Sequence, residues 1–215
     1  MPIPAAELLK RAGEILQDEE HIRWTVPELL RWVNDGARET ILRRPAARSI
    51  TRPLPLASGT KQEIPASGVQ LLDVVRNLGT NGSTPGRVIR RIDRQLLDDQ
   101  MPDWHMAKKS AKIKHYTFDE RAPKVFYVYP PAVDGVHVEA LYSELPPVIT
   151  DSAETLDMGA EYLNALLSYM AYRAFSKDSE FASGTVAALH FEAFVNAVGS
   201  GNEAASYNSP NTAST

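Results

Sequence analysis

One stretch of the sequence places side chains that transfer protons close to one another. It runs from Asp98 to His105 and contains three carboxylates beside a tryptophan and a histidine. Carboxylates in a cleft of this kind can acquire shifted pKa values, as catalytic acids and bases do. Asp103 and His105 are the acid–base pair that the stretch offers. No nucleophile motif or oxyanion loop accompanies them, so we favour a polar loop that Trp104 anchors in the core.

The sequence shows no pattern of metal ligands or of a phosphate-binding loop. No two of the five histidines stand at i, i+4 on an expected helix with a carboxylate at ligand spacing: His21, His105, His115, His137 and His190. Cysteine is absent, which excludes disulfides and thiolate catalysis. The glycine-rich stretch 79–87 lacks the Gly-Lys-Ser/Thr ending of a phosphate loop. The sequence therefore predicts no metal, no cofactor and no enzyme.

Basic residues concentrate between Arg87 and Lys114. This stretch could meet phosphates, an acidic partner surface or only solvent; its members are Arg87, Arg90, Arg91, Arg94, Lys108, Lys109, Lys112 and Lys114. Aromatic residues that follow it could stack on single-stranded bases or fill the core of a small β unit, and we favour the core; they are Tyr116, Phe118, Phe126, Tyr127, Tyr129 and Tyr142. A nucleic-acid-binding module is thus one alternative function.

The composition indicates a globular chain without a membrane span. Hydrophobic residues make up 43% of the 215 residues, and the net charge is −4, which argues against nucleic-acid binding as the main function. There is no apolar run of about 18 residues that could cross a bilayer. The first residues lack the basic and then apolar order of a signal peptide, so we expect a protein that is made in a cytoplasm.

The elements that must position these side chains are helices at both ends of the chain and strands between them. Helical periodicity predicts helices over 5–19, 25–44 and 159–175, and a last helix after residue 178 that ends at Gly199 and Gly201. Thr25 and Glu28 have the spacing of a capping box. The predicted face of the last helix contains Val186, Leu189, Ala193 and Ala197.

The middle of the chain has the shorter period and the turn residues of strands. Segments 50–56 and 61–64 are expected to form a hairpin, with the first as an edge strand because it contains Pro53 and Pro55. Segments 71–78 and 87–92 form a second candidate pair. Segments 113–118, 124–129 and 136–142 are expected to form a three-stranded meander.

Helices, then strands, then helices are the order of an α+β fold. We expect a helical bundle from residues 1–47 and 150–199, with a small antiparallel β domain inserted at 48–149. Residues 200–215 contain mainly small and polar side chains, which predicts a flexible C-terminal tail. The helix at 159–175 carries two neighbouring apolar stripes, so it should lie at the centre of the bundle.

Taken together in this order, several segments resemble the adaptor, or head-to-tail connector, proteins of tailed bacteriophages. The resemblance spans roughly Ile22 to Val198. It rests on Arg23-Trp24, Glu28 to Glu39, Gly59 to Gln62 with Ile64-Pro65, Pro102 to His105, Lys114 to Tyr116, Phe118 to Glu120, Phe126 to Pro131 and Tyr172 to Asp178.

The resemblance implies a structural virion protein on a helical bundle, without catalysis or cofactor. Such adaptors form a ring, usually of twelve copies, beneath the portal protein of the head. They join the portal to tail, nozzle or tail-fibre proteins and line the channel through which genomic DNA leaves, without reading its sequence. The implied location is the head–tail junction of a virion that is assembled in the host cytoplasm.

Within this role the sequence suggests three groups of residues. The second apolar stripe of the 159–175 helix offers Tyr169 and Met170 to a subunit interface. A negative channel wall would repel phosphates, and the acidic side chains at the first helix suit it: Glu14, Asp18 and Glu19, with Glu7 and Glu20 as further candidates. The tail offers Ser206, Tyr207 and Asn208 for docking on the portal, because a segment that orders on binding gives reach at moderate affinity.

Overall fold

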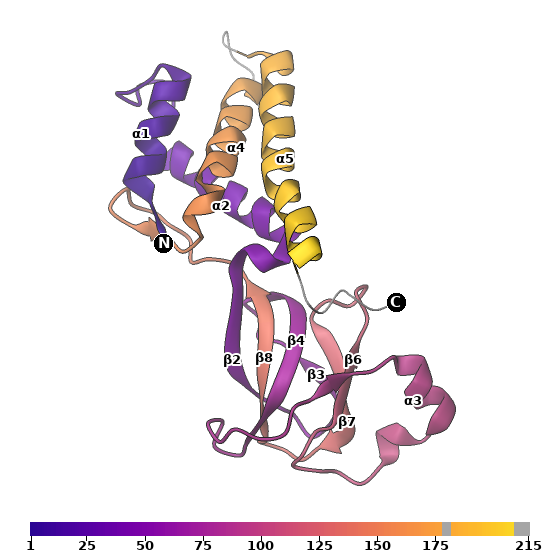
Figure 1. Ribbon diagram of the computed structural model, residues 1–215. Coiled ribbons are helices and arrows are strands. Elements are labelled where there is room, and N and C mark those ends of the chain that lie inside the picture. The colour runs from indigo at the N-terminus through magenta and orange to yellow at the C-terminus, as the bar shows by residue number, and fades with distance from the viewer. Residues whose placement is uncertain (178–181, 209–215) are drawn as a thin grey trace. The chain divides into compact units, whose positions relative to one another are not determined.

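The computed structural model describes residues 1–177 and 182–208, with side chains described as far as residue 199. The chain forms two compact units. Residues 1–48 and 145–215 belong to a helical unit, and residues 49–144 belong to a β unit (Figure 1). The prediction of an α+β fold is confirmed, since the described residues contain both helices and antiparallel sheets.

The helical unit contains four α-helices and one short strand pair in its described residues. Figure 1 shows α4 and α5 side by side, and α4 also contacts α1 and α2. The elements are β1 (Ile3–Pro4), α1 (Ala5–Leu16), α2 (Val26–Arg43), η1 (Pro45–Arg48), β9 (Thr155–Leu156), η3 (Ala160–Tyr162), α4 (Leu163–Ser176) and α5 (Gly184–Asn208).

Helix α2 begins where the sequence predicts, but without the predicted capping box. Thr25 has an extended backbone, and its carbonyl accepts the amides of Glu28 and Leu29 at 2.9 and 3.0 Å. Its side chain makes no capping hydrogen bond. The Glu28 carboxylate instead accepts from Lys177 Nζ at 2.7 Å, so the residue that should close the box ties the start of α2 to the end of α4.

Helix α4 is the centre of the helical unit, because it contacts α1, α2 and α5, and Gly36 of α2 lies close against it. A methyl group placed on Gly36 of α2 would lie 2.9 Å from Cδ1 of Tyr169. The Tyr169 ring also makes an edge contact with Phe194 of α5, with ring centroids 5.2 Å apart. Gly36 therefore allows α2, α4 and α5 to meet around a single buried ring.

Helix α5 differs from the prediction in both its end and its face. It continues through Gly199 and Gly201 to Asn208, so the predicted end is wrong. The side chains that it buries are Ala187, Phe194 and Val198, whereas Leu189 is 61% exposed. The predicted face is wrong because the aromatic cluster around Tyr169 draws Phe194 inward in place of the smaller alanine face.

The β unit consists of two sheets that face each other across one apolar core. The three-stranded sheet has the order β2-β8-β4, and the four-stranded sheet has the order β3-β7-β6-β5. The elements are β2 (Ser49–Pro55), β3 (Gly59–Glu63), β4 (Gly68–Gly79), β5 (Arg90–Arg91), α3 (Arg94–Gln100), η2 (Trp104–Met106), β6 (His115–Phe118), β7 (Val125–Ala132) and β8 (His137–Glu144).

Strand positions were predicted better than strand partners. Strand β2 is an edge strand, as Pro53 and Pro55 indicated, but it pairs with β8 and not with β3. The turn between β2 and β3 instead passes from one sheet to the other. The buried Gln62 amide holds this corner, since it exchanges hydrogen bonds of 2.8 Å with the backbone N–H and C=O of Ala57. The predicted hairpin is therefore wrong.

The predicted meander is right for its first pair and wrong for its third strand. Strands β6 and β7 pair antiparallel, but β8 lies in the other sheet between β2 and β4. Residues 87–92 join the sheets along one side. The Asn77 amide of β4 donates to Arg87 carbonyl at 3.0 Å, whereas Arg90 and Arg91 run parallel to β6.

The contact between Gly36 and Tyr169 can be tested by the sign of the stability change in Gly36→Ala. On helix propensity alone, Gly36→Ala should stabilise the protein by about 1 kcal/mol. Because the added methyl meets a buried ring that also packs on Phe194, we expect destabilisation by about 1–3 kcal/mol, measured by urea unfolding. Gly199→Ala in α5, where an added methyl meets nothing within 4 Å, is the control and should be neutral or stabilising. Equal effects of the two changes would contradict this packing.

Candidate functional site

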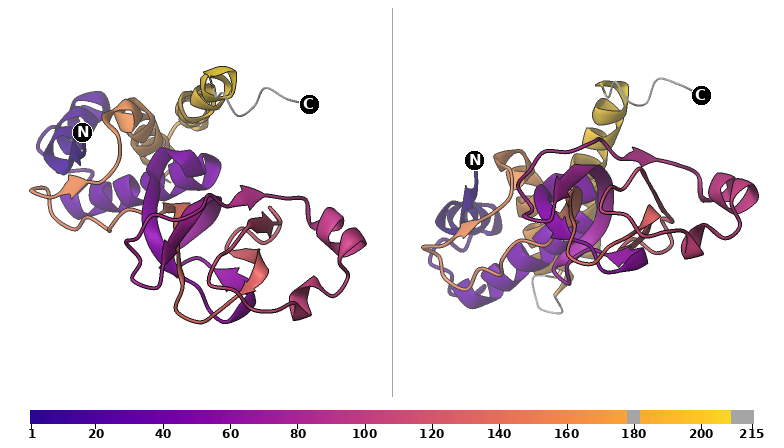
Figure 2. Two further views of the ribbon diagram at one scale, coloured as in Figure 1. Left: turned by 60° about the horizontal axis from the view of Figure 1, so that its bottom comes forward. Right: turned by 90° about the horizontal axis from the view of Figure 1, so that it is seen from below.

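The stretch that could transfer protons forms an arm that leaves the four-stranded sheet after β5 and returns at β6. It contains α3 and η2 and lies at the edge of the β unit in both views of Figure 2. Asp93 begins α3, since its carboxylate accepts the Gln95 amide at 2.9 Å. Between Arg94 and Asp98 an ion pair of 3.1 Å lies along the helix.

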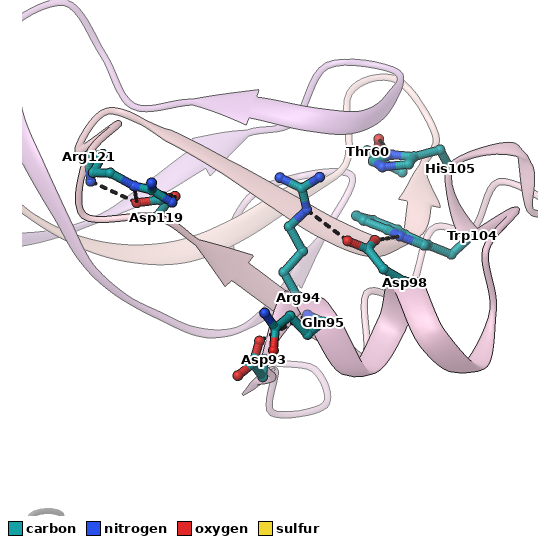
Figure 3. A network of polar contacts seen from close by, with 9 residues as sticks. All are labelled: Thr60, Asp93, Arg94, Gln95, Asp98, Trp104, His105, Asp119 and Arg121. Atoms are coloured by element: carbon teal, nitrogen blue, oxygen red, sulfur yellow. Dashed lines mark hydrogen bonds and ion pairs between the residues drawn. The ribbon is translucent and has the colours of Figure 1, made fainter.

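Trp104 anchors the arm on the sheet. Its side chain is only 1% exposed, and its ring meets the edges of Tyr127 and Tyr129 of β7. The indole Nε1–H donates to the Asp98 carboxylate at 2.8 Å (Figure 3). This bond and the nearby Arg94 hold the pKa of Asp98 below its usual value, against a smaller effect of desolvation. The predicted anchoring role of Trp104 is confirmed.

Asp103 and His105 do not form an acid–base pair in this arm. His105 stacks on Trp104 with ring centroids 3.7 Å apart, and its Nδ1 lies 2.8 Å from Thr60 Oγ1 of β3. Asp103 lines a shallow depression of about 350 Å³ with Met101, Pro102, Trp104, Met106, Ala107 and Tyr129, and His105 is not among the lining residues. The depression that Asp103 lines therefore does not bring these two groups together, whereas a shared concave site is what an acid–base pair uses.

The aromatic residues of the β unit are not free to stack on bases. Tyr116, Phe126 and Tyr142 are buried in the core. Tyr127 and Tyr129 pack against the arm, and the Arg91 guanidinium lies 4.6 Å above the Phe118 ring. The prediction that they fill a core is confirmed for the three buried rings. The basic residues Arg87, Arg90 and Lys114 remain exposed.

Tyr169 and Met170 are core residues of the helical unit. Tyr169 is 8% exposed and Met170 is 0% exposed. The reason for placing them in a subunit interface was that a single chain leaves them uncovered, and this premise is wrong. Helices α1, α2 and α5 together cover both stripes of α4, so these side chains have no surface to offer to a neighbouring copy.

The three acidic residues proposed for a channel wall differ in their surroundings. Glu14 and Glu19 are exposed. Asp18 is partly buried and accepts the backbone amides of Ile22, Arg23 and Trp24 at 2.8–3.0 Å. Desolvation raises the pKa of Asp18, but these N–H donors more than offset it, so the net shift is downward. Asp18 therefore shapes the loop that places Trp24 against Trp32, a role the sequence analysis missed.

Ser206, Tyr207 and Asn208 lie in the last turn of α5. Their side chains lie outside the described part of the chain, as do residues 209–215 altogether. The proposed docking role of these three residues thus stays a prediction.

Sequence reasoning also missed two polar side chains that fix the fold around these surfaces. Asn34 of α2 and the buried Asn77 of β4 each use both ends of the side-chain amide on backbone groups far away in the sequence. Asn34 follows the buried Val33, and Asn77 precedes the buried Leu78. A polar residue next to core positions is the sequence signal that could have identified both, because a buried polar group needs partners.

Among residues 1–177 and 182–208, no helix has the length and apolar character needed to cross a membrane. Within the same residues, no group of three His, Asp or Glu side chains is placed to hold a metal ion.

The bond between Trp104 and Asp98 can be tested through the titration of Asp98. Trp104→Phe keeps the buried ring but removes the N–H donor, so we expect the Asp98 pKa to rise towards the ordinary aspartate value. Carboxyl-carbon NMR in a pH titration measures this. The control is Arg121→Ala, which removes the partner that lowers the Asp119 pKa to about 2 and should leave Asp98 unchanged. An Asp98 titration that Trp104→Phe does not move would refute the assignment.

Comparison with known proteins identifies the family of the chain. The family model described as SU10 adaptor protein matches residues 3–214. No curated protein matches the chain. The match covers nearly the whole sequence, including both ends that the resemblance in the sequence left out. It agrees with the α+β fold of the described residues, which form a helical unit and a β unit. The chain belongs to the SU10 adaptor protein family, a family of phage adaptor proteins with a structural role.

Proposed function

We propose that this adaptor forms a ring at the head–tail junction of a virion, assembled in the host cytoplasm. There it joins the portal protein to tail, nozzle or tail-fibre proteins and lines the channel for genomic DNA. The family match carries this proposal. The structure gives a catalytic role less support, because the depression that Asp103 lines does not include His105, whose Nδ1 lies 2.8 Å from Thr60 Oγ1.

The distribution of charge supports a channel-lining role for the helical unit. This unit has 10 Lys and Arg residues against 16 Asp and Glu residues, a net charge of −6, whereas the β unit has 13 against 11, a net charge of +2. We assign Glu14 and Glu19 to the channel wall, because they are exposed and make no ion pair within the described residues. A negative wall lets DNA slide, since phosphates are repelled.

The nucleic-acid-binding alternative has lost part of its support. Three of the aromatic rings that could have stacked on bases are buried in the β core, and two more lie against the arm. The sixth ring, Phe118, lies beneath the Arg91 guanidinium, and the exposed cations are the main part of the proposed surface that the structure leaves open.

Assembly and portal docking can be tested in one experiment. Native mass spectrometry of the full chain should give a ring, which we expect to contain twelve copies, and a larger complex with the portal protein. A chain that ends at Ala205 lacks Ser206, Tyr207 and Asn208 but keeps most of α5. It should form the ring and fail to bind the portal. Portal binding by the shortened chain would refute the docking role, and a chain that stays monomeric at all concentrations would refute the ring.

The channel assignment predicts a change in affinity for DNA. Glu14→Lys with Glu19→Lys should convert a repelling wall into one that retains phosphates, so DNA should bind at least tenfold more tightly at low salt. Fluorescence anisotropy with double-stranded DNA and the assembled ring measures this. The control is Glu192→Lys with Glu161→Lys, two exposed carboxylates elsewhere in the helical unit, with the same change in charge. Equal gains for both pairs would count against a channel position for Glu14 and Glu19.

A further inference from the structure

Three exposed cations gather around one imidazole at the side of the four-stranded sheet. Arg90 of β5 lies opposite His115 of β6 in the parallel register, and its backbone N–H donates to the Lys114 carbonyl at 3.1 Å. Arg87 lies just before β5. Partial burial lowers the pKa of His115, and the charges of Arg87, Arg90 and Lys114 lower it further. We call Arg87, Arg90 and Lys114 the cationic edge.

The cationic edge lacks carboxylate partners within the residues that the structure describes. Other arginines of the β unit do have such partners, including Arg76 with Glu139 at 2.7 Å and Arg121 with Asp119 at 2.6 Å. No ion pair joins a described carboxylate to Arg87, Arg90 or Lys114. Like charges repel one another, so an anionic group that approaches the edge would offset the repulsion among these cations.

The anionic group is more consistent with protein carboxylates than with nucleic-acid phosphates. The ring next to the edge, Tyr129, is half-buried and already lies beside His115 and Trp104, with ring centroids 6.5 Å from each. The β unit carries a net charge of only +2, whereas nucleic-acid-binding domains are usually strongly basic. The helical unit of the same chain carries a net charge of −6. Its excess carboxylates could supply the anionic partners that the cationic edge does not have.

We propose that the cationic edge binds the acidic helical unit of a neighbouring copy of this chain. The inference rests on the proposed ring. A ring of identical subunits needs two different surfaces that complement each other, one on each side of every copy. An edge that is positive and a unit that is negative form such a pair, and their complementarity would also fix the direction in which copies add.

The first test reverses the charge of the edge. Arg87→Glu, Arg90→Glu and Lys114→Glu together should lower the association constant of the full chain more than tenfold at low salt, measured by sedimentation velocity. In the unmodified chain, association should weaken as salt rises, because screening acts on exposed charges. Circular dichroism and thermal unfolding of the variant monomer confirm that it folds.

The matched control reverses three exposed cations of the helical unit, Lys10→Glu, Arg31→Glu and Arg38→Glu. It changes the net charge by the same amount, so any effect of total charge alone appears in both variants. We expect the control to associate at least as well as the unmodified chain. Equal losses in both variants, or no loss in either, would overturn the proposal. If the edge variant associates normally but loses DNA binding in a gel shift, nucleic acid is the partner and the proposal is wrong.

The second test uses the absence of cysteine from the chain. Lys112→Cys introduces a single thiol two residues before Lys114, which can carry a photoreactive maleimide. Rings are assembled from two kinds of chain: natural-isotope (light) chains that carry the photoreactive group, and nitrogen-15 (heavy) chains that do not. The mixed rings are then irradiated and digested. Light-to-heavy cross-links into residues 1–48 or 145–199 are expected. Cross-links that stay within one copy, reach only other β units or reach added DNA would overturn the inference and leave the ring intact. Failure of the unmodified chain to form rings would instead remove the proposed function beneath it.

Discussion

The fold depends on the way the chain closes its helical unit after a long excursion. The chain leaves this unit after Arg48 and returns at Leu145. The Asn34 side chain receives the returning segment, since its Nδ2 donates to the Ile149 carbonyl at 2.8 Å and its Oδ1 accepts the Ile149 amide at 3.0 Å. Arg48 adds bonds to the Leu145 carbonyl and to Asp157. One amide and one guanidinium therefore satisfy backbone groups that would otherwise be left without partners when the two halves of the helical unit meet.

The β unit uses the same device where its two sheets join. The Asn77 amide donates to the carbonyls of Arg87 and Ile113, and its oxygen accepts the Ile113 amide at 2.8 Å. These bonds fix both ends of the segment that contains the arm. The Trp104 ring and the hydrogen bond between His105 and Thr60 then hold the arm on the sheet, together with bonds from Lys109 to Ser58 and from Ser110 to Pro131. The position of the arm thus follows from the placement of its two ends, and polar residues within it, such as Asp93, Asp98 and His105, hold its local shape.

The sequence predicted local features well and distant partners poorly. The start of α2 at Thr25, the edge position of β2 and the anchoring by Trp104 depend on neighbours along the chain, and the structure agrees with them. The partners of β2 and β8 depend on a corner held by Gln62, which no periodicity reveals. Tyr169 was misread because a wide apolar face has two explanations, and the contact with Gly36 that decides between them joins residues far apart in the sequence.

The strands that connect the two units run side by side. The chain leaves the helical unit at the start of β2 and returns to it from the end of β8. Ser49 and Ser143 are partners at this end of the antiparallel pair. The two points at which the chain enters and leaves the β unit are thus about 5 Å apart, so both covalent connections between the units start from one strand pair. A force that separates these two points would break the hydrogen bonds between β2 and β8 one after another, beginning at Ser49 and Ser143. A force that acts on both points in the same direction would instead load the two strands together.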